Sequence, residues 1–343
     1  MSFQVSIQDT EHRFTAEPDQ SVLKAALAAG FIIPYSCQDG ACGSCKGRLV
    51  SGDIDYGNCS HEALSEEERA QGLALFCQAK ARSDLVIKPR ELRIGGDIEV
   101  RKMPMRVLSI QRASAPDVVV LKLQPPATMK FDFYAGQYLD VLLRDGTRRS
   151  FSMGNAPEGA EAIELHVRQV PGGNFTDHVF NKMKEREILR VEAPLGTFYL
   201  REESPKPVVF VASGTGFAPI KSIIESSLHA GIKRPMTVYW GGRRPRDLYM
   251  SEVAEAWAKE HDHIQYVPVI SEALPEDNWT GRDGFVHRAV MQDFPDLSGY
   301  QVYACGVPIM VESAHRDFVA RCRLPEDEFY SDSFTSEVDK HGG

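Results

Sequence analysis

Four of the seven cysteines in this 343-residue chain follow one spacing, and that spacing constrains the fold more than any other feature. Cys37, Cys42 and Cys45 stand in one short Gly-rich segment, and Cys77 lies well downstream. Three thiolates from a tight loop and one from a distant element can clamp two iron atoms. The pattern therefore predicts a [2Fe–2S] cluster, with the spacing of plant-type ferredoxins.

The alternative for these cysteines is a structural zinc site. Zinc sites favour paired Cys-x2-Cys sequences, and only Cys42 and Cys45 form such a pair. Gly40 and Gly43 permit unusual φ angles and let backbone N–H groups approach cluster sulfur atoms. These features favour the cluster, and Cys59, outside the pattern, is interpreted as an ordinary thiol.

The composition excludes several classes of protein. With 43% hydrophobic and 25% charged residues, the chain is typical of globular proteins, and its length suits two or three domains. No run approaches about 18 apolar residues, so no membrane partner is expected. The net charge of −9 argues against a nucleic-acid partner, because phosphate binding needs clustered Lys and Arg. Residues 1–5 lack the basic and apolar regions of a secretory signal, which predicts a cytoplasmic protein.

Changes of pattern along the chain predict three domains. The part that holds the cysteine loop mixes strands with a helix. The next part consists mostly of short strands between Pro and Gly, which indicates a small antiparallel barrel. The last part alternates strands and helices, which predicts a doubly wound parallel sheet with ligands at the carboxyl ends of its strands. The predicted bounds are 1–90, a linker at 91–101, 102–203 and 204–343.

The same patterns predict the individual elements. Strands are expected at 3–8, 13–17, 86–88, 118–123, 138–143, 163–167, 188–192, 208–212, 236–240, 264–269 and 301–304. Helices are expected at 21–29, 176–184, 219–229, 251–260 and 309–320.

Two strings in the last part have the chemistry of a nucleotide site. Gly214-Thr215-Gly216-Phe217-Ala218-Pro219 follows an apolar strand and opens a helix. Its glycines let the backbone close on a pyrophosphate, and Pro219 suits the first helical turn. The string is not the Rossmann Gly-x-Gly-x-x-Gly. Cys305-Gly306-Val307-Pro308 ends another strand, where the alternative is an ordinary buried cysteine.

Residues 36–47, Ser-Cys-Gln-Asp-Gly-Ala-Cys-Gly-Ser-Cys-Lys-Gly, resemble the ferredoxin loop of the oxygenase-reductase family in the ferredoxin–NADP⁺ reductase superfamily. The resemblance covers nearly the whole chain and includes the CDP-6-deoxy-3,4-glucoseen reductases. It implies a multidomain α+β and α/β protein. The domains would be a β-grasp plant-type ferredoxin, an antiparallel β-barrel that binds FAD, and a doubly wound parallel-sheet domain that binds NAD(P)H. FMN is the alternative flavin.

The resemblance also implies roles in flavin binding. Arg149-Ser150-Phe151-Ser152 is similar to the superfamily's Arg-x-Tyr-Ser, although taken alone it is an ordinary strand end. Arg149 would neutralise the pyrophosphate, the ring at 151 would stack on the isoalloxazine, and Ser152 would reach flavin N5. Phe151 replaces a tyrosine, so a hydroxyl is lost. Gly173-Asn174-Phe175-Thr176 matches Gly-x-x-Ser/Thr, and Thr176 is expected to begin a helix whose N–H groups face phosphate.

For the nicotinamide nucleotide, the resemblance implies that Cys305 and Gly306 lie beside the nicotinamide ring. Asp247 is expected to accept the ribose hydroxyls and to repel a 2′-phosphate, which favours NADH over NADPH. The arginines at 243, 244 and 246 oppose that preference. Phe334 is expected to shield the flavin, with packing of aromatics on the core as the alternative.

The predicted function is electron transfer from NADH through FAD and the cluster to a partner protein. A cluster cannot accept a hydride and nicotinamide avoids one-electron chemistry, so the flavin separates the electron pair. The expected partner is a Rieske, diiron or cytochrome P450 oxygenase that docks at the ferredoxin domain. Alternatives are a sugar-nucleotide dehydrase as partner, a self-sufficient NAD(P)H oxidase, and a zinc-stabilised binding module fused to a nucleotide domain.

Negative charge near the cysteine loop could steer a basic partner. It comes from Asp39, Glu62 and Glu66–Glu68. The alternative is that Glu66–Glu68 only begins a helix, where acidic side chains suit the helix dipole.

Overall fold

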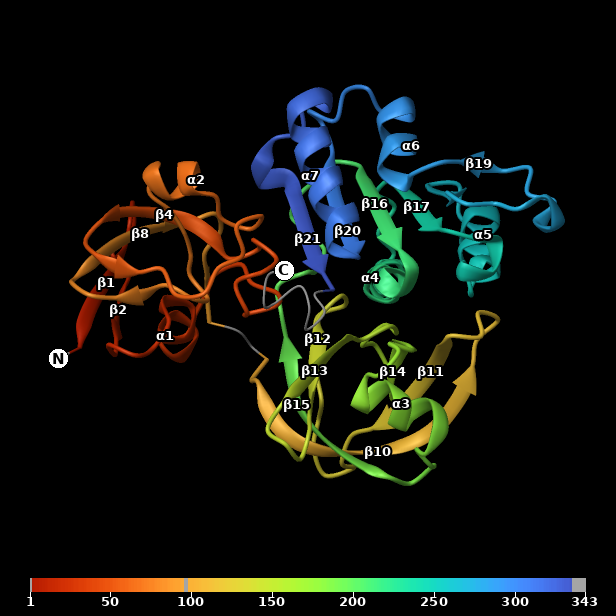
Figure 1. The fold of residues 1–343 in the computed structure, drawn as a ribbon, viewed down its shortest axis with the longest axis horizontal. Coiled ribbons are helices and arrows are strands. Elements are labelled where there is room, and N and C mark those ends of the chain that lie inside the picture. The colour runs from red at the N-terminus through yellow and green to blue at the C-terminus, as the bar shows by residue number, and fades with distance from the viewer. Residues whose placement is uncertain (1, 96–97, 335–343) are drawn as a thin grey trace. The chain divides into compact units, whose positions relative to one another are not determined.

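The computed structural model describes residues 2–95 and 98–334, which form two compact units. The first unit comprises 2–95, 98–99 and 332–334, and the second comprises 100–331. The second unit therefore holds both the antiparallel and most of the parallel sheet (Figure 1).

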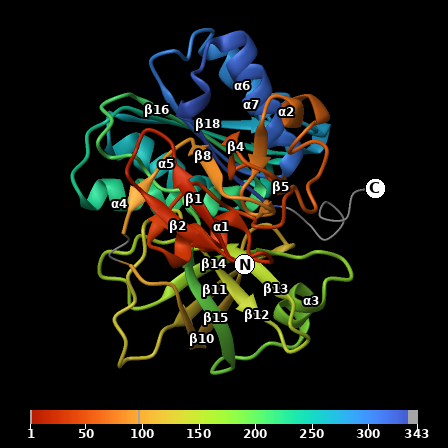
Figure 2. The ribbon, with the colours of Figure 1, turned by 90° about the vertical axis from the view of Figure 1, so that its left-hand side faces the viewer.

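The first unit is a mixed five-stranded sheet in the order β2-β1-β8-β4-β6, with α1 packed against it (Figure 2). β1 pairs antiparallel with β2 and parallel with β8, which gives the β-grasp arrangement that the sequence predicts. The elements are β1 (Phe3–Ile7), β2 (Arg13–Ala16), α1 (Val22–Ala28), β3 (Phe31–Ile32), β4 (Lys46–Ser51), β5 (Ile54–Asp55), α2 (Glu66–Ala70), β6 (Leu73–Leu75), β7 (Lys80–Ala81), β8 (Leu85–Pro89) and β9 (Arg93–Ile94).

The start of α1 forms as its sequence predicts. The Ser21 side chain accepts a hydrogen bond from the backbone N–H of Lys24, which satisfies a donor that has no partner inside the helix. The segment 91–101 differs from the expected linker, because β9 pairs antiparallel with β3. Without β9, the backbone N–H and C=O groups along this edge of the short β3 would lack a strand partner, and β9 pairs with them.

The antiparallel sheet of the second unit closes into a barrel. Its strand order is β13-β12-β15-β10-β11-β14, and Met153, just after β13, bridges Leu165 of β14. The two edge strands therefore meet. The elements are β10 (Arg101–Arg112), β11 (Val118–Gln124), β12 (Tyr138–Leu142), β13 (Arg148–Ser152), β14 (Ile163–Arg168), α3 (Asn174–Asn181) and β15 (Ile188–Leu195).

The parallel sheet has the order β19-β18-β17-β16-β20-β21, and β16 pairs in parallel with both β17 and β20. Its elements are β16 (Val208–Ser213), α4 (Phe217–His229), β17 (Met236–Gly242), α5 (Ser251–Glu260), β18 (Ile264–Ile270), β19 (Arg282–Asp283), α6 (Val286–Asp293), β20 (Gln301–Gly306), α7 (Pro308–Cys322) and β21 (Phe329–Ser333). The sequence prediction omits the short elements β19, α6 and β21. In parallel pairing the carboxyl ends of β16, β17 and β20 lie at one edge.

Helix α4 joins this sheet to the barrel (Figure 1). Lys221 donates to the carbonyl of Gly154 at 3.0 Å, and the Ser222 hydroxyl donates to the carbonyl of Asn155 at 2.7 Å. These bonds tie the helix to the chain just beyond β13, so the end of the flavin-type motif and the nucleotide-binding helix lie together.

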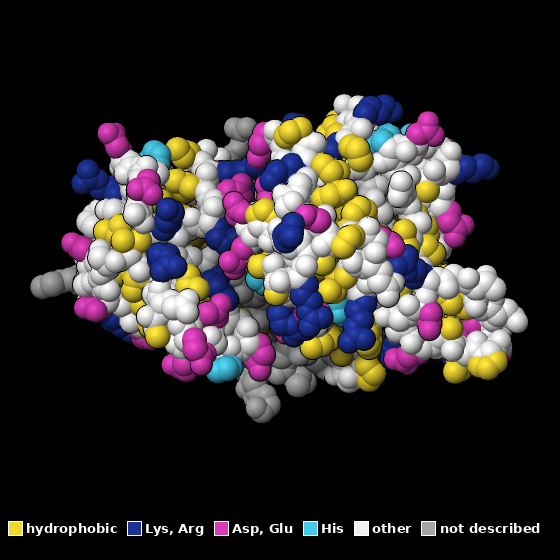
Figure 3. All heavy atoms as spheres, turned by 90° about the horizontal axis from the view of Figure 1, so that it is seen from above, with side chains coloured by type: hydrophobic (Ala, Val, Ile, Leu, Met, Phe, Trp, Pro, Cys, Tyr) yellow, Lys and Arg dark blue, Asp and Glu magenta, His cyan; other side chains and the backbone are white. Residues whose placement is uncertain are grey.

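Charges of both signs are interspersed on the face that Figure 3 shows. Within the described part of the chain, no helix combines the length and apolar character needed to cross a membrane.

Candidate functional site

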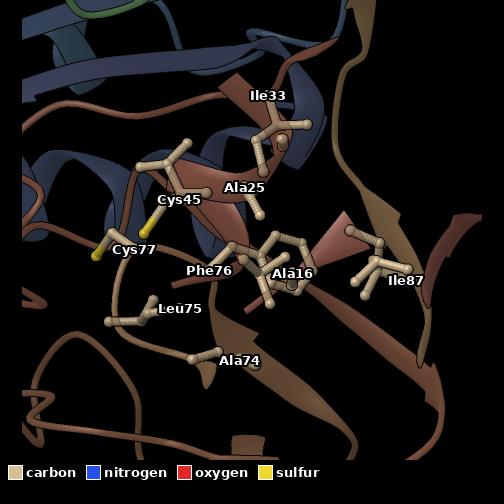
Figure 4. Packing of buried hydrophobic residues seen from close by; sticks show 14 of the residues in the cluster. Ala16, Ala25, Ile33, Cys45, Ala74, Leu75, Phe76, Cys77 and Ile87 are labelled. Carbon is tan, nitrogen blue, oxygen red and sulfur yellow. The ribbon is translucent and has the colours of Figure 1, made fainter. Parts of the chain in front are cut away.

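The four predicted cluster cysteines lie together in the first unit. Cys45 and Cys77 are buried, and Cys37 and Cys42 are partly exposed. The side chains approach in two pairs, Cys37 with Cys42 and Cys45 with Cys77. Figure 4 shows the sulfur atoms of Cys45 and Cys77 on the same side, away from the packed core around Phe76.

The backbone of the cysteine loop has the geometry that its glycines allow. Gly40 has φ +80°, and a Cβ there would lie only 2.3 Å from the carbonyl oxygen of Asn58. The N–H of Asp39 donates to Cys37 Sγ at 3.4 Å. The loop can therefore supply backbone donors to sulfur.

The pairing of the thiols suits two iron atoms better than one zinc ion. A structural zinc site needs four donors around one point. In a [2Fe–2S] cluster the four cysteines divide over two irons, which is the arrangement the two pairs offer.

In the barrel, Arg149 and Phe151 lie on the same face of β13, because side chains alternate along a strand. The Phe151 ring lies 5.4 Å from that of Phe175, between ring centres, in the first turn of α3. This contact brings the start of α3, whose first N–H groups lack helical partners, close to Phe151. Ser152 is buried at the end of β13, opposite Tyr138.

The structure shows the local contacts of two further flavin-motif residues, Ser150 and Thr176, and their expected roles in FAD binding stay predictions. The Ser150 hydroxyl donates to Asp140 Oδ1 at 2.6 Å, on the face opposite Arg149 and Phe151. The helix expected to begin at Thr176 begins at Asn174, after the N-cap Gly173. The Thr176 hydroxyl lies inside the first turn and bonds backbone atoms of Val170 and Gly173, so it secures the preceding turn.

The Gly214-Thr215-Gly216 string forms a 3₁₀ turn between β16 and α4, at the carboxyl edge of the sheet. Pro219 is buried in the first turn of α4. Gly216 packs directly on β20, because a Cβ there would lie 2.1 Å from the carbonyl oxygen of Cys305. Cys305 is fully buried beside Gly306, at the carboxyl end of β20. The structure therefore brings the glycine turn and the predicted nicotinamide cysteine together.

Asp247 lies in the turn after β17, and its expected contact with the ribose stays a prediction. It is buried, and its Oδ2 accepts the backbone N–H groups of Arg243 and Arg244 at 2.9 and 3.1 Å. Asp247 thus holds the turn after β17. Phe334 is half-buried directly after β21 and belongs to the first unit, so its expected place on the flavin stays a prediction.

Arg168, at the end of β14, was missed by the sequence patterns. Its guanidinium atoms would lie 3.5–3.8 Å from a Cβ on Gly214, and its Nε and Nη2 are buried without a hydrogen-bond partner among the residues that the structure describes. Asp117 is 3.6 Å from Nη1. Buried guanidinium donors normally have acceptors, so this arginine is suited to an anionic ligand at the glycine turn. The only feature of the sequence that could have indicated this role is an arginine at the end of a strand, shortly before Gly172-Gly173.

A cysteine-lined β-grasp unit, an antiparallel barrel and a parallel nucleotide-type sheet define an iron–sulfur flavoprotein oxidoreductase. Comparison with known protein families supports this assignment for each of the three parts. Residues 5–82 match a 2Fe-2S iron-sulfur cluster binding domain, residues 105–199 an oxidoreductase FAD-binding domain, and residues 210–316 an oxidoreductase NAD-binding domain. The predicted cofactor classes and fold class are confirmed, and these matches replace the zinc-module alternative.

Full-length relatives have the same layout. The chain is 41% identical over 334 residues to the CDP-6-deoxy-L-threo-D-glycero-4-hexulose-3-dehydrase reductase of Yersinia pseudotuberculosis, covering 97% of this chain and 99% of the relative. It is 36% identical to reductase component 2 of terephthalate 1,2-dioxygenase from Comamonas sp., covering 99% and 100%. The crystal structure of an Amycolatopsis cytochrome P450 reductase aligns with a TM-score of 0.79 and 33% identity, covering 98% and 100%. The chain belongs to this family of three-domain ferredoxin–FAD–NAD(P)H reductases.

Proposed function

We propose that this protein is a reductase component that passes electrons from NADH through FAD and its [2Fe–2S] cluster to a separate acceptor protein. The observation that carries the proposal is the presence of all three cofactor domains in one chain, in the order found in full-length relatives. FAD accepts a hydride and releases single electrons, which is the chemistry that links a nicotinamide to a cluster.

The cluster would be held by the two thiol pairs, with one iron between Cys37 and Cys42 and the other between Cys45 and Cys77. The closeness of the side chains within each pair supports this division. The partial exposure of Cys37 and Cys42 supports the proposal that their side of the cluster would lie nearer the surface of the first unit, where an acceptor would dock.

The flavin would lie along β13. Phe151 would stack on its ring system, Ser152 would address N5, and Arg149 with the first N–H groups of α3 would hold the pyrophosphate. The common face of Arg149 and Phe151 and the contact of Phe151 with Phe175 support this placement. Ser150, which bonds Asp140, would orient the strand rather than touch FAD.

The nicotinamide nucleotide would bind at the turn Gly214–Gly216, with its pyrophosphate near Arg168 and its nicotinamide near Cys305. The buried donors of Arg168 beside Gly214 support the first placement, and the packing of Gly216 on Cys305 supports the second. Asp247 Oδ2 already accepts two backbone N–H groups, so a ribose would have to share this carboxylate with the turn. NADH remains our proposed donor. A higher kcat/KM with NADPH would contradict it and would assign the exposed Arg243 and Arg246 to a 2′-phosphate.

The acceptor would be an oxygenase, as the name of the terephthalate 1,2-dioxygenase reductase component indicates for that protein. A sugar-nucleotide dehydrase is the second candidate, supported by the 41% identity to a dehydrase reductase. Purified protein should contain FAD, two irons and acid-labile sulfide, and should reduce one of these acceptors with NADH. Stoichiometric zinc without sulfide would refute the proposal.

Docking at the first unit can be tested by charge reversal. Glu68 is unsuitable, because it completes the capping box of α2 and pairs with Lys46 at 2.5 Å. Glu62 and Glu67 are exposed, so Glu62→Lys with Glu67→Lys should slow the reduction of a basic acceptor such as cytochrome c at low salt. Glu252→Lys with Glu260→Lys, on α5, is the matched control. Equal effects of both pairs would contradict docking at the first unit.

A further inference from the structure

A buried chain of polar side chains joins the barrel to the nucleotide-binding sheet within the second unit. It consists of Glu164 and His166 on β14, Lys221 on α4, and Tyr249 just before α5. The His166 side chain has no exposed surface, and Tyr249 is 2% exposed. No sequence motif includes these residues.

The hydrogen bonds along this chain have one consistent direction. His166 Nε2 lies 2.9 Å from Glu164 Oε1. Burial alone would raise the pKa of Glu164, but the hydrogen bond from His166 and the charge of Lys221 outweigh it and lower the pKa to about 2. The carboxylate can therefore only accept, so Nε2 carries the proton. The other nitrogen, Nδ1, then accepts from the Tyr249 hydroxyl at 2.7 Å.

At its barrel end, the buried chain of polar side chains contacts the segment that follows the flavin motif Arg149–Ser152. Lys221 Nζ lies 3.2 Å from Glu164 Oε1 and donates to the carbonyl of Gly154 at 3.0 Å. Gly154 follows Ser152 by two residues, and a Cβ on Gly154 would lie 3.0 Å from His166 Nε2. The barrel end of the buried chain of polar side chains is therefore hydrogen-bonded to the segment that carries Ser152.

The other end reaches the glycine turn. The Tyr249 ring meets the Trp240 ring edge-on, with 5.2 Å between ring centres. Trp240 Nε1 donates to the carbonyl of Gly214 at 3.0 Å, and its ring stacks on Phe217 at 3.8 Å. Burial raises the pKa of the Tyr249 hydroxyl, and Arg168 and Cys305 are among the nearby groups that influence it, so this hydroxyl lies in their neighbourhood. The buried chain therefore connects the flavin side of the site with the nicotinamide side.

We propose that Tyr249 and His166 are positioning residues that fix the glycine turn relative to Ser152, so that the nicotinamide and the flavin meet in the geometry for hydride transfer. The inference rests on the proposed function. Neither residue touches the reacting atoms. They act through Trp240 and Gly214 on one side and through Glu164, Lys221 and Gly154 on the other. A misplacement of about 1 Å between reacting groups costs about a hundredfold in rate.

The decisive variant is Tyr249→Phe, which keeps the ring against Trp240 and removes only the hydroxyl. Stopped-flow reduction of the bound flavin by NADH should slow by about tenfold or more, while the Kd for NADH changes less than about twofold. Hydrogen–deuterium exchange of the holoenzyme should rise in the peptide that contains residues 213–218. Tyr266→Phe is the matched control, because it removes a hydroxyl that meets Ser251 on α5, and it should change none of these values.

A second variant, His166→Gln, tests the same chain from the barrel side. Because the two residues act as one unit, the double variant should be about as slow as the slower single variant. Rates are compared per bound FAD. The proposal would be overturned if Tyr249→Phe reduced its flavin at the rate of the unmodified protein, or if the variant weakened NADH binding instead of slowing reduction. Unchanged hydrogen–deuterium exchange at 213–218 would overturn it too, and so would a double variant whose loss of rate is the product of the two single losses. Failure of NADH to reduce the flavin of the unmodified protein would instead refute the proposed function.

Discussion

Gly216→Ala should disrupt the nicotinamide side of the site through space alone. The φ angle of Gly216 is −61°, which any residue can adopt, so the substitution brings no backbone strain. The added Cβ would lie 2.1 Å from the carbonyl oxygen of Cys305, 2.5 Å from its carbon and 2.8 Å from the Gly306 Cα. All three are backbone atoms of β20, so no side chain can rotate away.

The expected losses of stability and of reduction rate follow from how closely the added Cβ would approach these backbone atoms. Non-bonded heavy atoms settle about 3.5–4.0 Å apart. The glycine turn and β20 must therefore separate by more than an ångström. Overpacking of this kind costs about 1–3 kcal/mol of stability. Because the turn and Cys305 flank the proposed nicotinamide position, a shift of this size should slow flavin reduction by about a hundredfold.

The assay is stopped-flow reduction of the flavin by NADH, with bound FAD and the midpoint of thermal unfolding measured on the same sample. Gly299→Ala is the control, since no atom of residues 2–95 and 98–334 outside its chain neighbours lies within 4 Å of a Cβ there. It should reduce at the normal rate. A Gly216→Ala protein that keeps its FAD and reduces within about threefold of the normal rate would refute the proposed binding of the nicotinamide nucleotide at the glycine turn beside Cys305.

Two further predictions concern Ser152, Cys305 and His166. Ser152→Ala and Cys305→Ala should each slow flavin reduction more than they weaken NADH binding, because both groups would address the hydride path; unchanged rates in stopped flow would make both residues structural. Burial lowers the pKa of His166 although Glu164 opposes the shift, so the unfolded chain takes up this proton first and stability should fall as the pH drops below about 6.5. Calorimetry between pH 7 and 5 should show a smaller fall for His166→Gln than for the unmodified protein, and equal falls would mean that His166 does not titrate on unfolding.

Local patterns in the sequence were sufficient to predict most of the fold. The Ser21 cap, the β1–β2 hairpin and the apolar β16 are encoded within a few residues each, and they form as predicted. The cysteine spacing and the string from Gly214 to Pro219 are local too. The structure places both in the predicted settings, in a β-grasp unit and between a parallel strand and a helix.

The prediction was weaker where a side chain's role depends on its neighbours in space. Asp247 was assigned by its type and position, but its carboxylate holds a turn. Ser150 was assigned with Arg149 and Phe151, although alternation along a strand turns it to the other face. His166 and Tyr249 are 83 residues apart, and each is ordinary in its own segment. Their connection becomes visible only where the segment just before α5 packs on β14 in space.

The central claim, that electrons pass from FAD to the cluster and then to the acceptor, is tested most directly by Cys42→Ser. Ferricyanide can take electrons from the flavin itself, whereas cytochrome c would receive them through the cluster. The account predicts that the variant keeps its FAD and its NADH–ferricyanide activity and loses NADH–cytochrome c activity. Equal loss of both activities with FAD still bound, or full retention of cytochrome c reduction without a cluster, would contradict it.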